Sequence, residues 1–240
     1  MKRQVLTVFV LMAVCLLTAF AATAAMAWNV AADFSETANP NSPWAFGWTD
    51  SGGVFTAFPS VGADWYGGYH IPTNGITAWY DYHAFPVVGH SNTGGNVTIW
   101  GRCLPLTTGM VMMCPGAAAT GRDAPAVVKW TADSGGSYAI SAQFTQLDWS
   151  SAAGVAVYTT SGSVNWTAAL TGQGTSASTA LTVSLAAGES VFFVCNKGSD
   201  GTNAYDTIGL VATVVPEPSC LTVLLAGGAG GAFMLRRRRV

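Results

Sequence analysis

Residues 64–100 hold the densest collection of side chains that could bind a ligand. Aromatic rings offer flat apolar faces with polar edges, and the C–H faces of sugar rings stack on such surfaces. Binding residues also gather in loops that a rigid scaffold carries. The segment therefore suggests a glycan platform, which would comprise Trp65, Tyr66, Tyr69, Trp79, Tyr80 and Tyr82. The alternative is that these rings fill the core and anchor long loops of a body rich in Ala and Gly.

Two groups of side chains raise the question of a metal. The histidines His70, His83 and His90 all lie near the aromatic residues, but spacings of 13 and 7 residues match no metal motif, so satisfied or exposed histidines are favoured. Calcium needs six to eight oxygen ligands. Oxygen donors cluster at one turn and in the opening segment, at Asp200, Asn203 and Asp206 and at Asp33 and Glu36. No EF-hand-like loop accompanies them.

Catalytic motifs are not evident. The sequence contains neither G-x-S-x-G nor H-E-x-x-H, and residues 28–215 contain only two glutamates, Glu36 and Glu189. We therefore predict a protein that is not an enzyme.

Three cysteines lie in the central part of the chain. Cys103 and Cys114 flank a loop that contains Pro and Gly, and an oxidising compartment permits a bridge between them. Two buried free thiols are the alternative. Cys195 lies among Val and Phe residues and is predicted to be a core side chain. Because there is no C-x-x-C pair, a zinc site is not expected.

Charge is concentrated at the two ends of the chain. Six of the ten Lys and Arg residues lie outside residues 28–215, which keep four basic and eleven acidic residues, a formal charge of −7. Such a body has no basic footprint for nucleic acid.

The candidate side chains must be positioned by β-strands. Apolar residues in the second half of the chain repeat with a period of two, which indicates strands with one buried face. The alternation is clear at Tyr138, Ile140, Ala142 and Phe144, again from residue 181 to 185, and again from 208 to 214. Gly-containing turns separate these runs, as in an antiparallel sandwich. No convincing helical period occurs outside the two terminal apolar segments. We predict an all-β fold.

The first 27 residues have the pattern of a secretory signal peptide. Lys2 and Arg3 precede an uncharged run over residues 5–25, and Ala25-Met26-Ala27 fits an A-x-A cleavage site. Cleavage after Ala27 would make Trp28 the first residue of the mature chain.

The last 25 residues combine three features in order. Pro216-Glu217-Pro218 comes first, an apolar span over residues 221–235 follows, and Arg236, Arg237, Arg238 and Arg239 end the chain before Val240. This arrangement resembles the PEP-CTERM sorting signal of bacterial exosortase substrates. The resemblance implies a short transmembrane helix, with its arginines on the cytoplasmic side. It also implies cutting near Pro218 by an exosortase-type protease, and export to the cell envelope, outer surface or extracellular matrix.

Residues 28–215 also resemble a β-sandwich domain that recurs in PEP-CTERM proteins. The similarity lies in V-V-K-W-T-A from residue 127, G-S-Y from 136, L-A-A-G-E-S-V from 185 and D-T-I-G-L from 206. It implies a jelly-roll-like antiparallel β-sandwich, a fold that often carries one structural calcium. Domain boundaries follow at 1–27, 28–215 and 216–240.

These patterns lead to one expected function and one alternative. We expect an exported structural or adhesive protein of the cell surface or matrix, anchored in the inner membrane before processing and contacting extracellular polysaccharide. The alternative is a dedicated carbohydrate-binding module.

Overall fold

The computed structural model describes residues 26–62, 75–81, 85–99, 102–116, 122–149, 152–160 and 163–217. Within these residues all the long elements are β-strands, and the only helix is the 3-10 turn η1 (Gly198–Asp200). The predicted all-β class is therefore confirmed. The predicted signal peptide and the predicted sorting signal lie almost entirely outside the described residues, and no described helix is long and apolar enough to cross a membrane.

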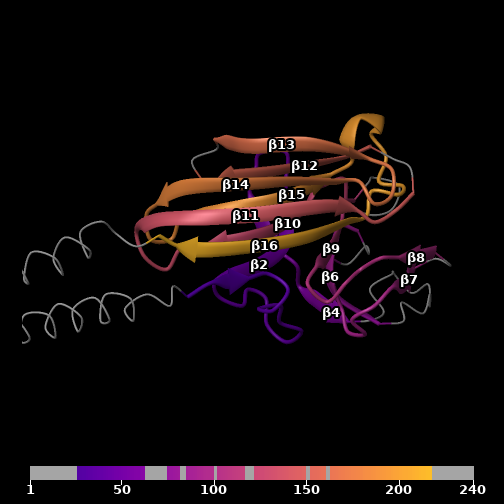
Figure 1. The fold of residues 1–240 in the computed structure, drawn as a ribbon, viewed down its shortest axis with the longest axis horizontal. Coiled ribbons are helices and arrows are strands. Elements are labelled where there is room, and N and C mark those ends of the chain that lie inside the picture. Colours follow the sequence, from indigo (N-terminus) through magenta and orange to yellow (C-terminus); the bar gives the residue numbers. More distant parts are fainter. Residues whose placement is uncertain are drawn as a thin grey trace, which may run out of the picture.

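The first sheet has eight antiparallel strands (Figure 1). Its order is β14 (Ser176–Leu185), β11 (Gly136–Gln146), β16 (Ile208–Pro216), β9 (Val111–Cys114), β6 (Val87–Ser91), β5 (Ile76–Tyr80) and β4 (Ser60–Gly62), while β1 (Trp28–Asn29) pairs with the far end of β16.

The second sheet has six antiparallel strands, and a separate two-stranded ribbon lies at the right of Figure 1. The order of the second sheet is β13 (Val164–Thr171), β12 (Ala152–Thr159), β15 (Ser190–Asn196), β10 (Ala126–Thr131), β2 (Trp44–Thr49) and β3 (Phe55–Ala57). The ribbon consists of β7 (Val97–Ile99) and β8 (Arg102–Leu104).

The two sheets share one apolar core. In β11 the predicted alternation is present, because Tyr138, Ile140, Ala142 and Phe144 are buried while the residues between them are partly or fully exposed. The same core contains side chains of the second sheet, including Trp44, Phe46, Val128, Trp130 and Phe193. Two antiparallel sheets that bury their facing sides form a β-sandwich. The jelly-roll-like topology stays a prediction.

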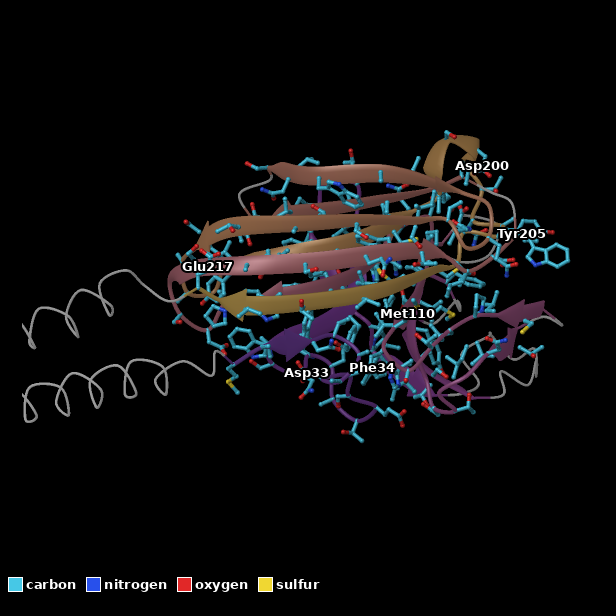
Figure 2. The ribbon with its side chains drawn as sticks, in the orientation of Figure 1. Asp33, Phe34, Met110, Asp200, Tyr205 and Glu217 are labelled. Atoms are coloured by element: carbon cyan, nitrogen blue, oxygen red, sulfur yellow. The ribbon has the colours of Figure 1, made fainter. Side chains whose placement is uncertain are left out.

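Both ends of the described chain lie at the same end of the sandwich. Trp28 is paired with Val214 near the end of β16, and the Trp28 ring packs 5.2 Å from that of Trp130. Figure 2 places Glu217 at one end of the long axis, and Asp200 and Tyr205 at the other. The body thus has one end where the chain enters and leaves, and one end built from loops.

Candidate functional site

The predicted glycan platform lies mostly outside the described residues, which do not include Trp65, Tyr66, Tyr69 or Tyr82. Its two described members lie in β5, between β4 and β6. Trp79 is only 5% exposed, and its Nε1 donates a hydrogen bond of 2.7 Å to the carbonyl oxygen of Ser35. Tyr80 packs against a second apolar cluster. Trp79 is therefore a core side chain rather than a platform, because both faces of β5 are covered.

The metal ligands suggested by the sequence are spread over different environments. Asp206 is fully buried, whereas Asp200 is exposed and accepts a hydrogen bond from the Thr202 backbone N–H. Asn203 donates to the Pro115 carbonyl oxygen over 3.3 Å. Among the described residues, no group of three or more His, Cys, Asp or Glu side chains could hold a metal ion. A calcium ion at the Asp200–Asp206 turn stays a prediction.

The opening acidic segment and the one described histidine have other partners. Asp33 Oδ2 accepts from the backbone N–H of Asn29 and from Nε1 of Trp44, at 2.9 and 3.1 Å. His90 stacks on Phe34, with ring centroids 5.3 Å apart. His70 and His83 lie outside the described residues.

The predicted bridge between Cys103 and Cys114 is not formed in the structure. Cys103 is an exposed free thiol on β8, whereas Cys114 is a buried free thiol on β9 that receives a hydrogen bond from Thr207. Cys195 is also buried and free, as expected for a core side chain. Burial raises the pKa of Cys114 and of Cys195 well above the ordinary thiol range, so both thiols are neutral at physiological pH.

An aromatic row that the sequence did not reveal crosses the outer face of the second sheet. We use this name for Phe55, Phe192 and Tyr158, which come from β3, β15 and β12. The rings of Phe55 and Phe192 are 6.3 Å apart, and those of Phe192 and Tyr158 are stacked at 5.0 Å with an interplanar angle of 15°. Val127 and Val194 lie buried in the same cluster. The row therefore has a rigid apolar base on a sheet.

Strand register and one glycine create this row. Phe192 is directly opposite Tyr158 on one side and Lys129 on the other, so their side chains share the outer face. Phe55 reaches that face by lying over Gly47, where a Cβ atom would come 2.7 Å from its ring. A Cβ atom there would also collide with the backbone carbonyl oxygen of Thr56, so any larger residue at position 47 would push away both β3 and the Phe55 ring.

Polar groups flank the row on one side. Lys129 Nζ lies 5.2 Å from the centroid of the Phe55 ring. Phe55 and Lys129 also line an open hollow of about 370 Å³, together with Pro40, Ser42, Pro43, Trp44, Ala45, Ala57 and Thr131. Other described basic side chains are committed elsewhere, since Arg122 pairs with Asp81 and Lys197 with Asp123. At the other end of the row, burial raises the pKa of Tyr158, and a hydrogen bond with Thr49 partly offsets this rise.

Comparison with known proteins gives structural likeness only. No protein-family model and no curated protein sequence matches the chain. Among solved structures, a CBM4 structure is 14% identical with a TM-score of 0.32, and the match covers 76% of this chain and 92% of that one. The K3 cleaved adhesin domain of Lys-gingipain from Porphyromonas gingivalis W83 is 18% identical, with 44% and 73% covered and a TM-score of 0.29. A family 35 carbohydrate-binding module from Clostridium thermocellum is 15% identical, with 42% and 86% covered and a TM-score of 0.26.

Proposed function

We propose that this chain is an exported structural or adhesive protein of the cell surface or extracellular matrix, and that its sandwich contacts extracellular polysaccharide. The observation that supports this most is the aromatic row on the outer face of the second sheet. Its role is binding rather than catalysis.

The row has the chemistry that a sugar chain requires. Phe55 and Tyr158 are partly exposed and flank the buried Phe192, so a chain lying across the strands meets two accessible aromatic surfaces. Pyranose C–H faces stack on such rings, while the Tyr hydroxyl and the lysine ammonium supply polar contacts at the edges. Strands hold these rings, so little conformational entropy is lost when a ligand binds.

The ends of the chain support export and sorting. Signal peptidase would cut after Ala27, which is exposed, so that Trp28 begins the mature chain. Pro216 and Glu217 of the PEP tripeptide directly follow the body, and Pro216 is the last residue of β16. An exosortase-type protease would therefore work at the end of the sandwich where β1 begins and β16 ends, next to the membrane that holds the apolar tail.

A dedicated carbohydrate-binding module is the second candidate, and the hollow beside Phe55 favours it. A concave site of about 370 Å³ with Ser42, Thr131 and Lys129 in its wall could recognise one particular sugar unit. An adhesive protein, by contrast, needs only the open row.

A glycan array probed with the mature protein from the envelope tests the proposal. Broad, weak binding to several matrix polysaccharides is the result expected for an adhesive role. Selective binding of one oligosaccharide would instead support the dedicated module. If the protein binds no glycan on the array at any concentration, the proposed contact with polysaccharide is refuted.

A further inference from the structure

The two large sheets have four edge strands, and β14 differs from the other three. A strand at the end of a sheet presents unpaired N–H and C=O groups, which can pair with another chain. Proteins reduce this risk with short strands, bulges, charged side chains or proline. The ends here are β14 and β4 in the first sheet and β13 and β3 in the second.

Three of these ends carry such a protection. Both β3 and β4 are three residues long. The pairing of β13 with β12 contains a register shift between Val157 and Tyr158, which bends and twists this edge. These strands therefore offer little length or regularity for pairing with another chain.

The fourth end, β14, carries none of them. It spans ten residues, S-A-S-T-A-L-T-V-S-L, without a charge, a proline or a glycine. It pairs continuously with β11 from Ser176 to Leu185, and within the described residues β11 is its only partner. Every second residue, from Ser176 to Ser184, is exposed. The other side of β14 is thus a long and regular edge that no described strand pairs with.

We propose that β14 pairs in antiparallel fashion with β14 of a second copy of this chain, so that the first sheet continues across a twofold axis. A twofold contact brings the same patch of both copies together. Directly opposite residues of an antiparallel pair lie on the same face of the sheet. A register centred on Ala180 places residues of the same face opposite each other over nearly the whole strand.

The pairs that this register creates are compatible. On the outer face, Ser178 is opposite Thr182, and Ala180 is opposite its own copy. On the inner face, Thr179 is opposite Leu181, and Ala177 is opposite Val183. No charged side chain is placed against another, because β14 contains none.

Electrostatics favours this edge over the rest of the surface. Two bodies of formal charge −7 repel each other, but β14 contributes none of that charge. The acidic group bound to β14 is Glu217, whose carboxylate accepts from Ser137 and Thr182 at 3.1 and 3.4 Å. In the paired state the two Thr182 residues are four positions apart, about 13 Å along the strand. Salt screens charges at that separation, since the Debye length is about 8 Å at physiological ionic strength.

Lysine substitutions on neighbouring strands test the pairing. Ala180→Lys places two ammonium groups directly opposite each other at the centre of the contact. Ser141→Lys is the matched control, because Ser141 lies beside Ala180 on the same face but on β11. The molar mass of the full chain in mild detergent is followed by light scattering as the protein concentration rises. We expect dimers for the wild type and for Ser141→Lys, and dissociation at least about tenfold easier for Ala180→Lys.

Two outcomes would overturn the proposal. One is a single-chain mass for the wild type at every concentration, and the other is equal dissociation of both lysine variants. Cysteine crosslinking gives a second measurement if a lysine disturbs folding. In a background that carries Cys15→Ser, Cys103→Ser and Cys220→Ser, so that only the buried Cys114 and Cys195 remain, Ala180→Cys should form a disulfide between copies under mild oxidation, because opposite Cα atoms lie about 4.5–5.5 Å apart. Ser141→Cys should not, since three strand spacings separate its copies by about 14 Å. Equal crosslinking of both would refute the register.

Discussion

At the scale of single residues, Trp79 tests whether a tryptophan of the predicted platform packs in the core or lies at the surface, where it could bind a glycan. Its ring is 5% exposed and its Nε1 is hydrogen-bonded to Ser35. Trp79→Ala should therefore lower the free energy of unfolding by about 3–5 kcal/mol. Trp149→Ala is the matched control, because Trp149 is 65% exposed and its loss should change stability by no more than about 0.5 kcal/mol. Urea unfolding of both variants decides, and equal stability of the two would place Trp79 at the surface.

The three body cysteines should differ in reactivity. The raised pKa values of Cys114 and Cys195 keep both thiols neutral up to pH values above the ordinary thiol range, and burial blocks access. Because folding raises these values, the stability they contribute is present below the ordinary thiol pKa and is lost as the pH rises through the folded values. At pH 8, a thiol reagent should label only Cys103 of these three cysteines in the native protein, and all three in denaturant.

Peptide mapping of that labelling also tests the bridge predicted from the sequence. A disulfide between Cys103 and Cys114 would leave both unlabelled in denaturant until a reductant is added. Labelling of both without reductant would agree with the free thiols of the structure.

At the scale of elements, two glycines near η1 share a backbone conformation but not an environment. Gly198 and Gly201 have φ of 65° and 70°. A Cβ atom at Gly198 would collide with the Ala152 carbonyl oxygen of β12, whereas one at Gly201 would meet nothing within 4 Å. Both alanine variants bear the strain of a left-handed residue, roughly 1–2 kcal/mol.

Gly198→Ala should therefore destabilise the fold by about 1–3 kcal/mol more than Gly201→Ala, because the turn and β12 must move apart. Chemical denaturation of both variants measures the difference. Equal destabilisation would show that the turn does not pack on β12 as closely as the structure indicates.

Strands with one exposed face could be predicted from the sequence, whereas strands covered on both faces could not. In β11, β14 and β16 the burial alternates as the sequence does. In β5, by contrast, Ile76 and Ala78 belong to one apolar cluster while Trp79 belongs to another. A strand buried on both sides loses its two-residue period. For this reason the segment containing Trp79 resembled an aromatic loop.

The aromatic row had no local signal at all. Phe55, Tyr158 and Phe192 are far apart in the chain and meet only because β3, β12 and β15 join one sheet. Each residue by itself fits an ordinary strand position. Only the register, with Tyr158 opposite Phe192, and the space above Gly47 bring their rings together.

At the scale of the whole molecule, the shared position of β1 and the end of β16 bears on processing. Intact-mass analysis of the envelope protein should find a chain that begins at Trp28 and lacks Arg236 to Arg239. The reason is that β16 ends at Pro216, the first residue of the Pro-Glu-Pro tripeptide, at the end of the sandwich where β1 also lies. A mature species that still carries the four arginines would exclude the second cut.

The central claim is that the outer face of the second sheet holds polysaccharide, and affinity electrophoresis of surface variants tests it most directly. Phe55→Ala and Tyr158→Ala each remove one partly exposed ring of the row, and Trp149→Ala removes an exposed ring elsewhere. In gels containing the polysaccharide that the wild type binds, the first two variants should lose retardation while melting as cooperative folds, because the loss of a stacked ring weakens sugar contact. Trp149→Ala should be retarded like the wild type. Full retardation of both row variants, or loss of retardation only in Trp149→Ala, would contradict the claim.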